Sequence, residues 1–238
     1  GPNMDEEEEL PRLTLGLLRR ADTMCPQRLA HEHASSRKPS RLGDAGFEVS
    51  NRITEDAILW HKGAIETDST AIAFPEPTDL GPEQCAYNAA LGRGYRISFP
   101  ERDVVIDDLG WSTDIDDLGV RLVGRVGIGL RHADGSHELR VLRTAPQRSL
   151  IDDVELQFTV LRATAWVDTF TLTVTNLLTL ESVPYDIDVT ERLPDARSWL
   201  EERLAVVQAR ADRQRPILGA DCRHCTCIPS CKKARESV

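Results

Sequence analysis

Cysteines are concentrated near the carboxyl end of this 238-residue chain, in a spacing that is typical of metal binding. Four of the six cysteines fall within the last seventeen residues. Cys222, Cys225 and Cys231 form a C-x2-C-x5-C array, and its two-residue gap lets the first two thiolates point at one centre, as metal knuckles and cluster loops require. A fourth thiolate would complete such a site.

Two cysteines are candidates for the fourth ligand. A single residue separates Cys227 from Cys225, so a strained geometry is expected if all four thiolates come from one short loop. Cys25 is the better candidate, and a site that joins it to the terminal array would link the two ends of the chain. Four thiolates suit both a 4Fe-4S cluster and zinc. Zinc ribbons usually present two C-x2-C pairs and this chain has one, so the spacing favours the 4Fe-4S cluster, with zinc as the alternative and free thiols third.

Charge is distributed unevenly along the chain. The net charge of -10 alone argues against broad attraction to nucleic acid. However, residues 10–41 carry seven basic and two acidic residues, and residues 203–238 carry eight basic and three acidic residues, so each end has a net charge of +5. If the fold brings these ends together, they form a basic patch that suits a phosphate backbone. The alternative is that both ends are ordinary solvated helix faces.

The composition indicates a folded chain, with 40% hydrophobic and 29% charged residues. We interpret residues 1–9 as a cloning remnant followed by an acidic disordered segment, and residues 10–238 as a single domain. No apolar stretch approaches the ~20 residues of a membrane helix, so no membrane association is expected. The acidic start is the opposite of a secretory signal, which predicts a cytoplasmic location without structural disulfides.

Hydrophobic periodicity predicts the elements that would position these residues. Helices are expected at residues 11–34 with Thr14 as N-cap, 51–65, 152–167, and 195–213 with Asp195 as N-cap. Strands are expected at residues 94–108, 120–131, 138–144 and 169–180, with a short edge at 185–189. The Asp134-Gly135 pair predicts a hairpin between the second and third of these strands. The expected fold class is α/β, with a mixed sheet flanked by helices.

The chain resembles the RecB-like nuclease family that carries a C-terminal iron–sulfur cluster, within the PD-(D/E)XK superfamily. This family includes the nuclease modules of AddAB helicase-nucleases and the exonucleases associated with CRISPR spacer acquisition. The resemblance covers nearly the whole chain, through Cys25-Pro26-x-Arg28, the hairpin over residues 124–144, Gln157 on the next helix and the ending over residues 219–231. It implies a restriction-endonuclease-like core closed by a 4Fe-4S cluster that staples the fold. The implied ligands are Cys25, Cys222, Cys225 and Cys231.

The same resemblance implies where catalytic residues should stand. Such nucleases hold one or two divalent metals with an Asp on the first hairpin strand and an Asp or Glu on the second, and a Lys follows two residues later. These positions fall on Gly127, Val141 and Arg143. Two carboxylates are therefore missing, and arginine is a poor proton shuttle because its pKa lies above 12, although it can still grip a phosphate. We therefore expect no catalytic residues and an emptied cleavage site.

Three functions are consistent with these features. The favoured one is a catalytically degenerate protein that binds DNA or acts as a scaffold, with a possible protein partner, in DNA repair, recombination or defence. Its candidate DNA contacts are Arg28, Arg143, Gln157, Arg223, Lys232 and Lys233. The second is an active metal-dependent exonuclease that uses other acids, such as Asp116 or Glu138, with His61 as a further possible metal ligand. The third is a redox-sensing DNA-binding regulator, because basic residues adjoin the cluster ligands.

Overall fold

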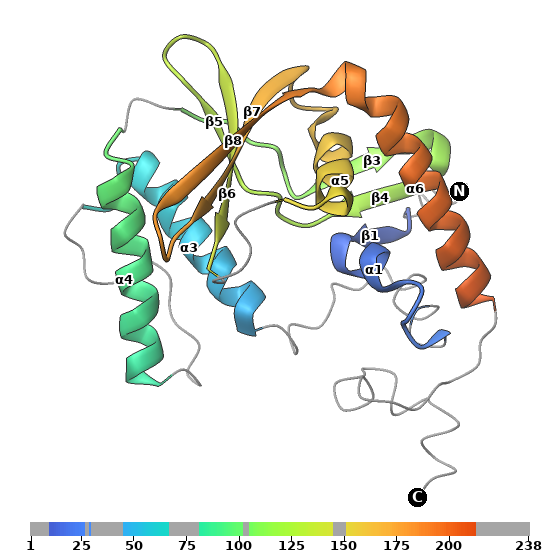
Figure 1. Ribbon diagram of the computed structural model, residues 1–238, viewed down its shortest axis with the longest axis horizontal. Coiled ribbons are helices and arrows are strands. Elements are labelled where there is room, and N and C mark those ends of the chain that lie inside the picture. Colours follow the sequence, from blue (N-terminus) through green and yellow to red (C-terminus); the bar gives the residue numbers. More distant parts are fainter. Residues whose placement is uncertain are drawn as a thin grey trace, which may run out of the picture. The chain divides into compact units, whose positions relative to one another are not determined.

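The computed structural model describes residues 10–26, 29, 45–66, 81–101, 105–144 and 151–212. These residues form helices and two mixed β-sheets (Figure 1), which confirms the α/β class with mixed sheets flanked by helices. They divide into two compact units. The first unit contains the described residues before residue 43, together with residues 111–124 and 195–212, and the second contains residues 45–110 and 125–194. Within the described ranges, no helix combines the length and apolar character that a membrane span requires.

The first unit is built on a three-stranded sheet in the order β1-β4-β3. Its elements are β1 (Arg12–Thr14), α1 (Leu15–Arg20), β3 (Ser112–Ile115), the short 3-10 helix η1 (Asp116–Leu118), β4 (Val120–Val123) and most of α6 (Val189–Ala211). Strand β1 is parallel to β4, and β3 is antiparallel to it. The Thr14 hydroxyl accepts a hydrogen bond from the Leu17 amide at 3.1 Å, which confirms Thr14 as the N-cap of α1.

Helix α6 begins earlier than the sequence predicted. The expected N-cap, Asp195, is wrong, because the Asp188 carboxylate accepts the Glu191 amide at 3.0 Å and Pro194 lies inside the helix. In the first unit, two arginines of α6 bind carbonyl groups of the N-terminal segment. The Arg203 guanidinium donates to the Leu18 carbonyl at 3.0 and 2.6 Å, and the Arg210 Nε donates to the Met24 carbonyl at 2.8 Å. Leu18 lies in the last turn of α1, where carbonyl groups have no partner within the helix, so Arg203 supplies a donor that the helix end needs.

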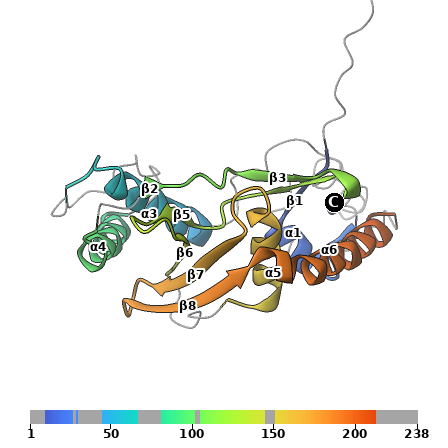
Figure 2. The same cartoon turned by 90° about the horizontal axis from the view of Figure 1, so that it is seen from above.

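The second unit contains a five-stranded sheet in the order β2-β5-β6-β7-β8. Its strands are β2 (Val105–Ile106), β5 (Ile128–Arg131), β6 (His137–Arg143), β7 (Thr169–Asn176) and β8 (Glu181–Asp188). All neighbours are antiparallel except β6 and β7, which are parallel and joined by α5 (Asp153–Ala163). Helices α3 (Ala45–His61) and α4 (Pro82–Ser98) lie on one side of this sheet, and α5 lies on the other (Figure 2).

One hydrophobic cluster of the second unit fills the space between the sheet and helices α3 and α4. Its buried members are Ile53, Ala57, Trp60, Leu91, Tyr95, Ile128, Leu130, Leu142 and Leu177. Because side chains alternate along a strand, Leu142 shares its face of β6 with Arg140 and Glu138, whereas Val141 and Arg143 face the other way. The two faces of β6 therefore carry different chemistry.

Two predicted strands differ from the structure. Residues 94–98 belong to α4, because Pro82 sits in the first turn of this helix rather than breaking the chain. The apparent alternation of Tyr95 and Ile97 reflects opposite faces of a helix, since Tyr95 is buried and Ile97 is 57% exposed. The strand expected at residues 120–131 is divided into β4 and β5 by Gly124 and Gly127, whose φ angles are 118° and 149°. The two strands consequently belong to different sheets.

Candidate functional site

The hairpin of β5 and β6 is the first candidate site, because the nuclease resemblance places the catalytic residues there. Its turn has the predicted form, with Gly135 at φ 85° and the Asp134 carboxylate accepting the Ser136 amide at 2.9 Å. Gly127 comes directly before β5 and approaches β6 closely. A Cβ atom at Gly127 would lie 2.6 Å from the Arg140 carbonyl oxygen, and its φ of 149° also favours glycine. No side chain fits at this position without movement of the backbone.

The other two hairpin positions are also occupied by groups that cannot hold a metal. Val141 is buried, with 6% of its surface exposed. Arg143, at the end of β6, forms an ion pair with Glu155 in the first turn of α5. Gln157, two residues further along α5, is half-buried. The two positions that the resemblance assigns to carboxylates are therefore tightly packed, and Arg143 is paired within the protein.

The predicted cluster ligands are only partly described. Cys25 is half-buried and directly follows Met24, whose carbonyl group binds Arg210 near the end of α6. The other three proposed ligands and four of the proposed DNA contacts lie outside the described residues. These are Cys222, Cys225, Cys231, Arg28, Arg223, Lys232 and Lys233. Within the described part of the chain, no group of three or more His, Cys, Asp or Glu residues is arranged to hold a metal ion.

Several aspartates before the hairpin have local partners. Asp114 forms a two-point ion pair with Arg121 at 2.6 and 3.0 Å, and this pairing lowers the pKa of the Asp114 carboxyl. Asp117 pairs with Arg197 on α6. The Asp108 carboxylate accepts the Gly110 amide at 2.6 Å. These carboxylates stabilise turns and ion pairs, and none of them belongs to a metal-binding group among the described residues.

A second candidate site is a buried polar network centred on Arg140, on the α3 and α4 side of β6. The Arg140 guanidinium donates to both Glu138 carboxylate oxygens at 2.8 and 3.0 Å and to the Tyr95 hydroxyl at 2.8 Å. Its carbon lies 4.0 Å from the centre of the Phe99 ring, a cation–π contact. The Tyr95 hydroxyl also contacts His61 Nε2 at 2.6 Å, and His132 Nε2 lies 2.8 Å from Glu138.

Burial and charge set the protonation states in this network. Burial raises the pKa of the Glu138 carboxyl, but the charge and hydrogen bonds of Arg140, with His132, outweigh it and the net pKa is lowered. For Tyr95, burial raises the pKa to about 12. Burial, with the nearby Arg140 charge, lowers the pKa of His61 from 6.5 to about 4. At neutral pH the network holds an ionised pair, a neutral phenol and a neutral imidazole.

Neutral His61 makes stability depend on pH. Between its folded pKa of about 4 and its unfolded pKa of 6.5, the unfolded chain binds a proton that the folded chain does not, so stability rises with pH. We expect this residue to add about 1.5 kcal/mol to the free energy of unfolding between pH 5 and pH 6.5. Urea unfolding of the wild type and of His61→Gln at both pH values should show this gain shrinking in the variant. An unchanged pH dependence in His61→Gln would contradict the assignment.

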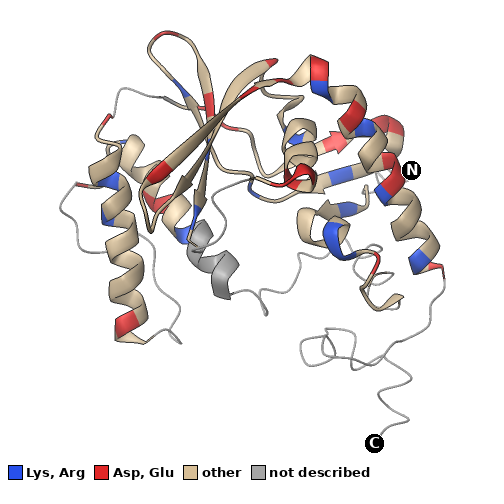
Figure 3. Cartoon of the chain, viewed as in Figure 1, with Lys and Arg blue, Asp and Glu red and all other residues tan. Residues whose placement is uncertain are grey.

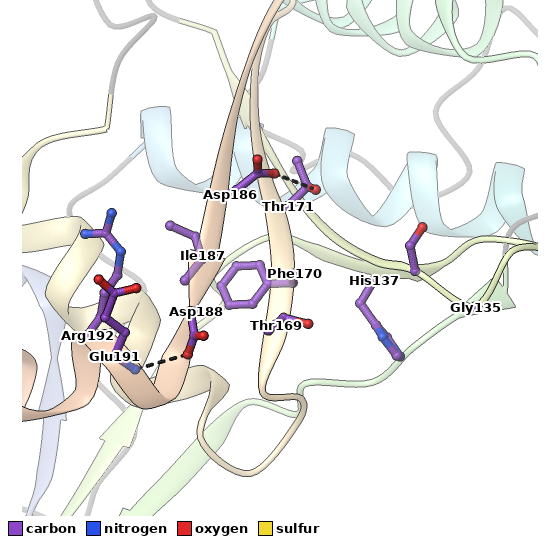
Figure 4. Close-up of a pocket in the computed structure, with 11 residues that line it drawn as sticks. Gly135, His137, Thr169, Phe170, Thr171, Asp186, Ile187, Asp188, Glu191 and Arg192 are labelled. Atoms are coloured by element: carbon purple, nitrogen blue, oxygen red, sulfur yellow. Dashed lines mark hydrogen bonds between the residues drawn. The ribbon is translucent and has the colours of Figure 1, made fainter.

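A shallow pocket of about 480 Å³ lies at the opposite end of β6 from Arg143 (Figure 4). It is lined by residues 135–137, the start of β7, the end of β8 and the first turn of α6. Two of its three carboxylates already have partners, since Asp188 caps α6 and Asp186 lies 3.5 Å from the Thr171 hydroxyl. Gly127, Val141 and Arg143 do not line this pocket, so it is distinct from the positions that the nuclease resemblance assigns to catalysis.

Comparison with known proteins adds no relative. No protein-family model matches the chain, and no curated protein is significantly similar to it. The candidate functions are thus weighed on the geometry of the chain itself.

Proposed function

We propose that the protein is a non-hydrolytic derivative of the RecB-like nuclease fold that binds DNA through its basic ends. The observation that carries this proposal is the packing at Gly127. The resemblance places a metal-binding aspartate at Gly127. In this chain, a Cβ atom at Gly127 would lie 2.6 Å from the Arg140 carbonyl oxygen. A carboxylate there would require the hairpin to move, so the loss of the acid is accommodated by the surrounding structure.

The order of elements supports the nuclease-like part of the proposal. The resemblance requires a hairpin followed by a helix that carries Gln157, and β5, β6 and α5 occur in this order. Helix α5 starts at Asp152, whose side chain accepts the Glu155 amide at 2.9 Å. Glu155 in turn pairs with Arg143. The position of the family's lysine is therefore tied to the following helix by an ion pair.

Contacts in the first unit support a cluster that joins the two ends. The Arg210–Met24 hydrogen bond places Cys25 beside the last turn of α6. Position 222 comes twelve residues after position 210, and an extended chain of that length spans up to ~40 Å. Cys222 is therefore within reach of Cys25, as a 4Fe-4S cluster on Cys25, Cys222, Cys225 and Cys231 requires. Zinc bound to the same thiolates is the alternative.

The same contacts support a DNA-binding role for the two basic segments. Arg203 on α6 contacts Asp22, two residues after α1, at 2.9 Å, so part of each basic segment lies side by side. Figure 3 shows basic positions on both α1 and α6. The sequence predicted a basic patch only if the fold brings the two ends of the chain together. The contact between the two segments favours such a patch in this unit, and clusters of positive charge attract phosphate backbones.

The test uses the full chain purified without oxygen, with iron and zinc measured in the wild type and in Cys25→Ala. We expect iron in the wild type, its loss in Cys25→Ala, and no cleavage of single- or double-stranded DNA with magnesium or manganese. Fluorescence anisotropy should show DNA binding that weakens with salt. Charge reversal by Lys232→Glu with Lys233→Glu should weaken binding about tenfold or more, whereas Arg131→Glu, an exposed change on β5, should not.

Three results would contradict the proposal. Sustained cleavage that disappears in Glu138→Ala or Asp116→Ala would indicate an active exonuclease with other acids. DNA affinity that is unchanged by the lysine reversals would remove the binding role of the basic ends. DNA affinity that differs between oxidised and reduced protein would favour the redox-sensing regulator instead.

A further inference from the structure

The backbone on both sides of Cys25, the one predicted cluster ligand among the described residues, is held in place. Met24 before it and Leu29 after it are buried, with 1% and 0% of their surfaces exposed. The Cys25 carbonyl group accepts the Leu29 amide at 2.9 Å, and Cys25 itself is half-buried. This arrangement fits a metal ligand, because such a ligand must be oriented and must still reach a centre that it shares with other residues.

The turn that leads from α1 to Cys25 is also closed by hydrogen bonds. The Arg20 carbonyl group, at the end of α1, accepts the Thr23 amide at 3.0 Å and the Met24 amide at 2.8 Å. The Thr23 hydroxyl donates to the same carbonyl at 3.3 Å, and Ala21 within the turn is 0% exposed. The chain therefore follows a fixed path from the last turn of α1 to the cysteine.

A side chain of α6 binds the peptide group of Cys25. Arg210 Nε donates to the Met24 carbonyl oxygen at 2.8 Å, and this oxygen belongs to the peptide bond that joins Met24 to Cys25. The peptide group is planar, so a hydrogen bond to its oxygen restricts rotation of the whole plane. Arg210 thus helps to set the direction in which the Cys25 backbone continues, and with it the direction of the Cys25 side chain.

A second arginine of α6 makes similar contacts further from the cysteine. Residues 203 and 210 are seven apart, so they lie on the same face of α6, which runs beside α1 (Figure 1). Arg203 donates to the Leu18 carbonyl at 3.0 and 2.6 Å and to the Asp22 carboxylate at 2.9 Å. Arg203 therefore anchors the same segment of the chain, but seven residues before Cys25.

We propose that Arg210 is a positioning residue for the metal centre and holds Cys25 in the orientation that the centre requires. This inference rests on the proposed function, in which Cys25 is one of the four thiolate ligands. Groups that form hydrogen bonds around a metal ligand orient it before the metal binds, and their replacement typically lowers metal affinity about 10–100-fold. The bond also attaches the last turn of α6, the element that precedes Cys222 in the chain, to the N-terminal ligand.

The rate of metal loss to excess EDTA tests this role, with the full chain purified without oxygen and its iron and zinc measured. We expect Arg210→Met to lose metal about tenfold or more faster than the wild type, because the Met24 carbonyl loses this donor. Arg210→Lys keeps a side-chain donor and should recover most of the retention. Arg203→Met is the matched control. It removes three hydrogen bonds to the same segment, away from Cys25, and should lose metal at the wild-type rate.

Metal loss from Arg210→Met at the wild-type rate would overturn the positioning role and leave the proposed function standing. Equally fast loss from Arg203→Met, or no recovery in Arg210→Lys, would also overturn it, because the bond would then only stabilise the segment as a whole. A wild type that binds neither iron nor zinc would overturn both the positioning role and the cluster on which it rests. Circular dichroism checks that each variant is folded. If Arg210→Met loses helix, Arg210→Gln takes its place.

Discussion

Asp56→Ala is expected to lower the free energy of unfolding by about 3–5 kcal/mol. The Asp56 carboxylate and the Arg96 guanidinium are 2.6 Å apart, and their side chains are 0% and 1% exposed. Removing the carboxylate takes this charged partner from a buried arginine, and the cost of breaking a buried pair is larger than the net contribution of the pair. Urea unfolding followed by circular dichroism measures the change. Gly92 strengthens the expectation, because its missing side chain makes room for this carboxylate.

Two controls separate burial from charge. Asp114→Ala removes one partner of an exposed pair, in which Arg121 and Asp114 are 30% and 39% exposed, and should cost no more than about 1 kcal/mol. The double variant Asp56→Leu with Arg96→Met replaces both charges by apolar groups and should recover most of the loss. Equal costs for Asp56→Ala and Asp114→Ala would show that the α3–α4 pair is not buried as described.

Local signals in the sequence predicted local structure well. Thr14 caps α1 and Asp134-Gly135 turns the hairpin, because each depends on a hydrogen bond or backbone angle within a few residues. The predicted start of α6 was wrong for a related reason. Asp188 and Asp195 are both suitable caps, and only the fold shows that the earlier one is used.

The Arg140 network could not be predicted from the sequence. His61 and Tyr95 are 34 residues apart, and Tyr95 and Arg140 are 45 residues apart, so no local pattern links them. The sequence suggested His61 as a possible metal ligand, yet its Nε2 contacts the Tyr95 hydroxyl in a buried position. The sequence showed that the hairpin lacks the residue types that the resemblance implies, but it did not show the packing of Gly127 against β6. The cluster ligands near the C-terminus remain a prediction.

Gly127→Ala is expected to lower the free energy of unfolding by about 3 kcal/mol or more. Two effects combine at this position. A φ of 149° strains any residue that has a Cβ atom, and that atom would lie 2.6 Å from the Arg140 carbonyl oxygen. Because the obstacle is backbone rather than a flexible side chain, β5 and β6 must separate locally to admit it. Arg140 also holds the Glu138 and Tyr95 contacts, so a shift of its backbone should disturb the buried network.

Gly124→Ala is the matched control, since Gly124 has a φ of 118° and no described atom within 4 Å of an added Cβ. It carries the backbone strain without the collision, so it should cost clearly less than Gly127→Ala in the same urea experiment. Gly127→Asp introduces the acid that the nuclease resemblance places at this position, and it extends the test to function. We expect it to be at least as unstable as Gly127→Ala and to bind no manganese in calorimetry. A stable Gly127→Asp that binds manganese would mean that the hairpin still accepts a metal-binding carboxylate, and it would contradict the proposed non-hydrolytic role.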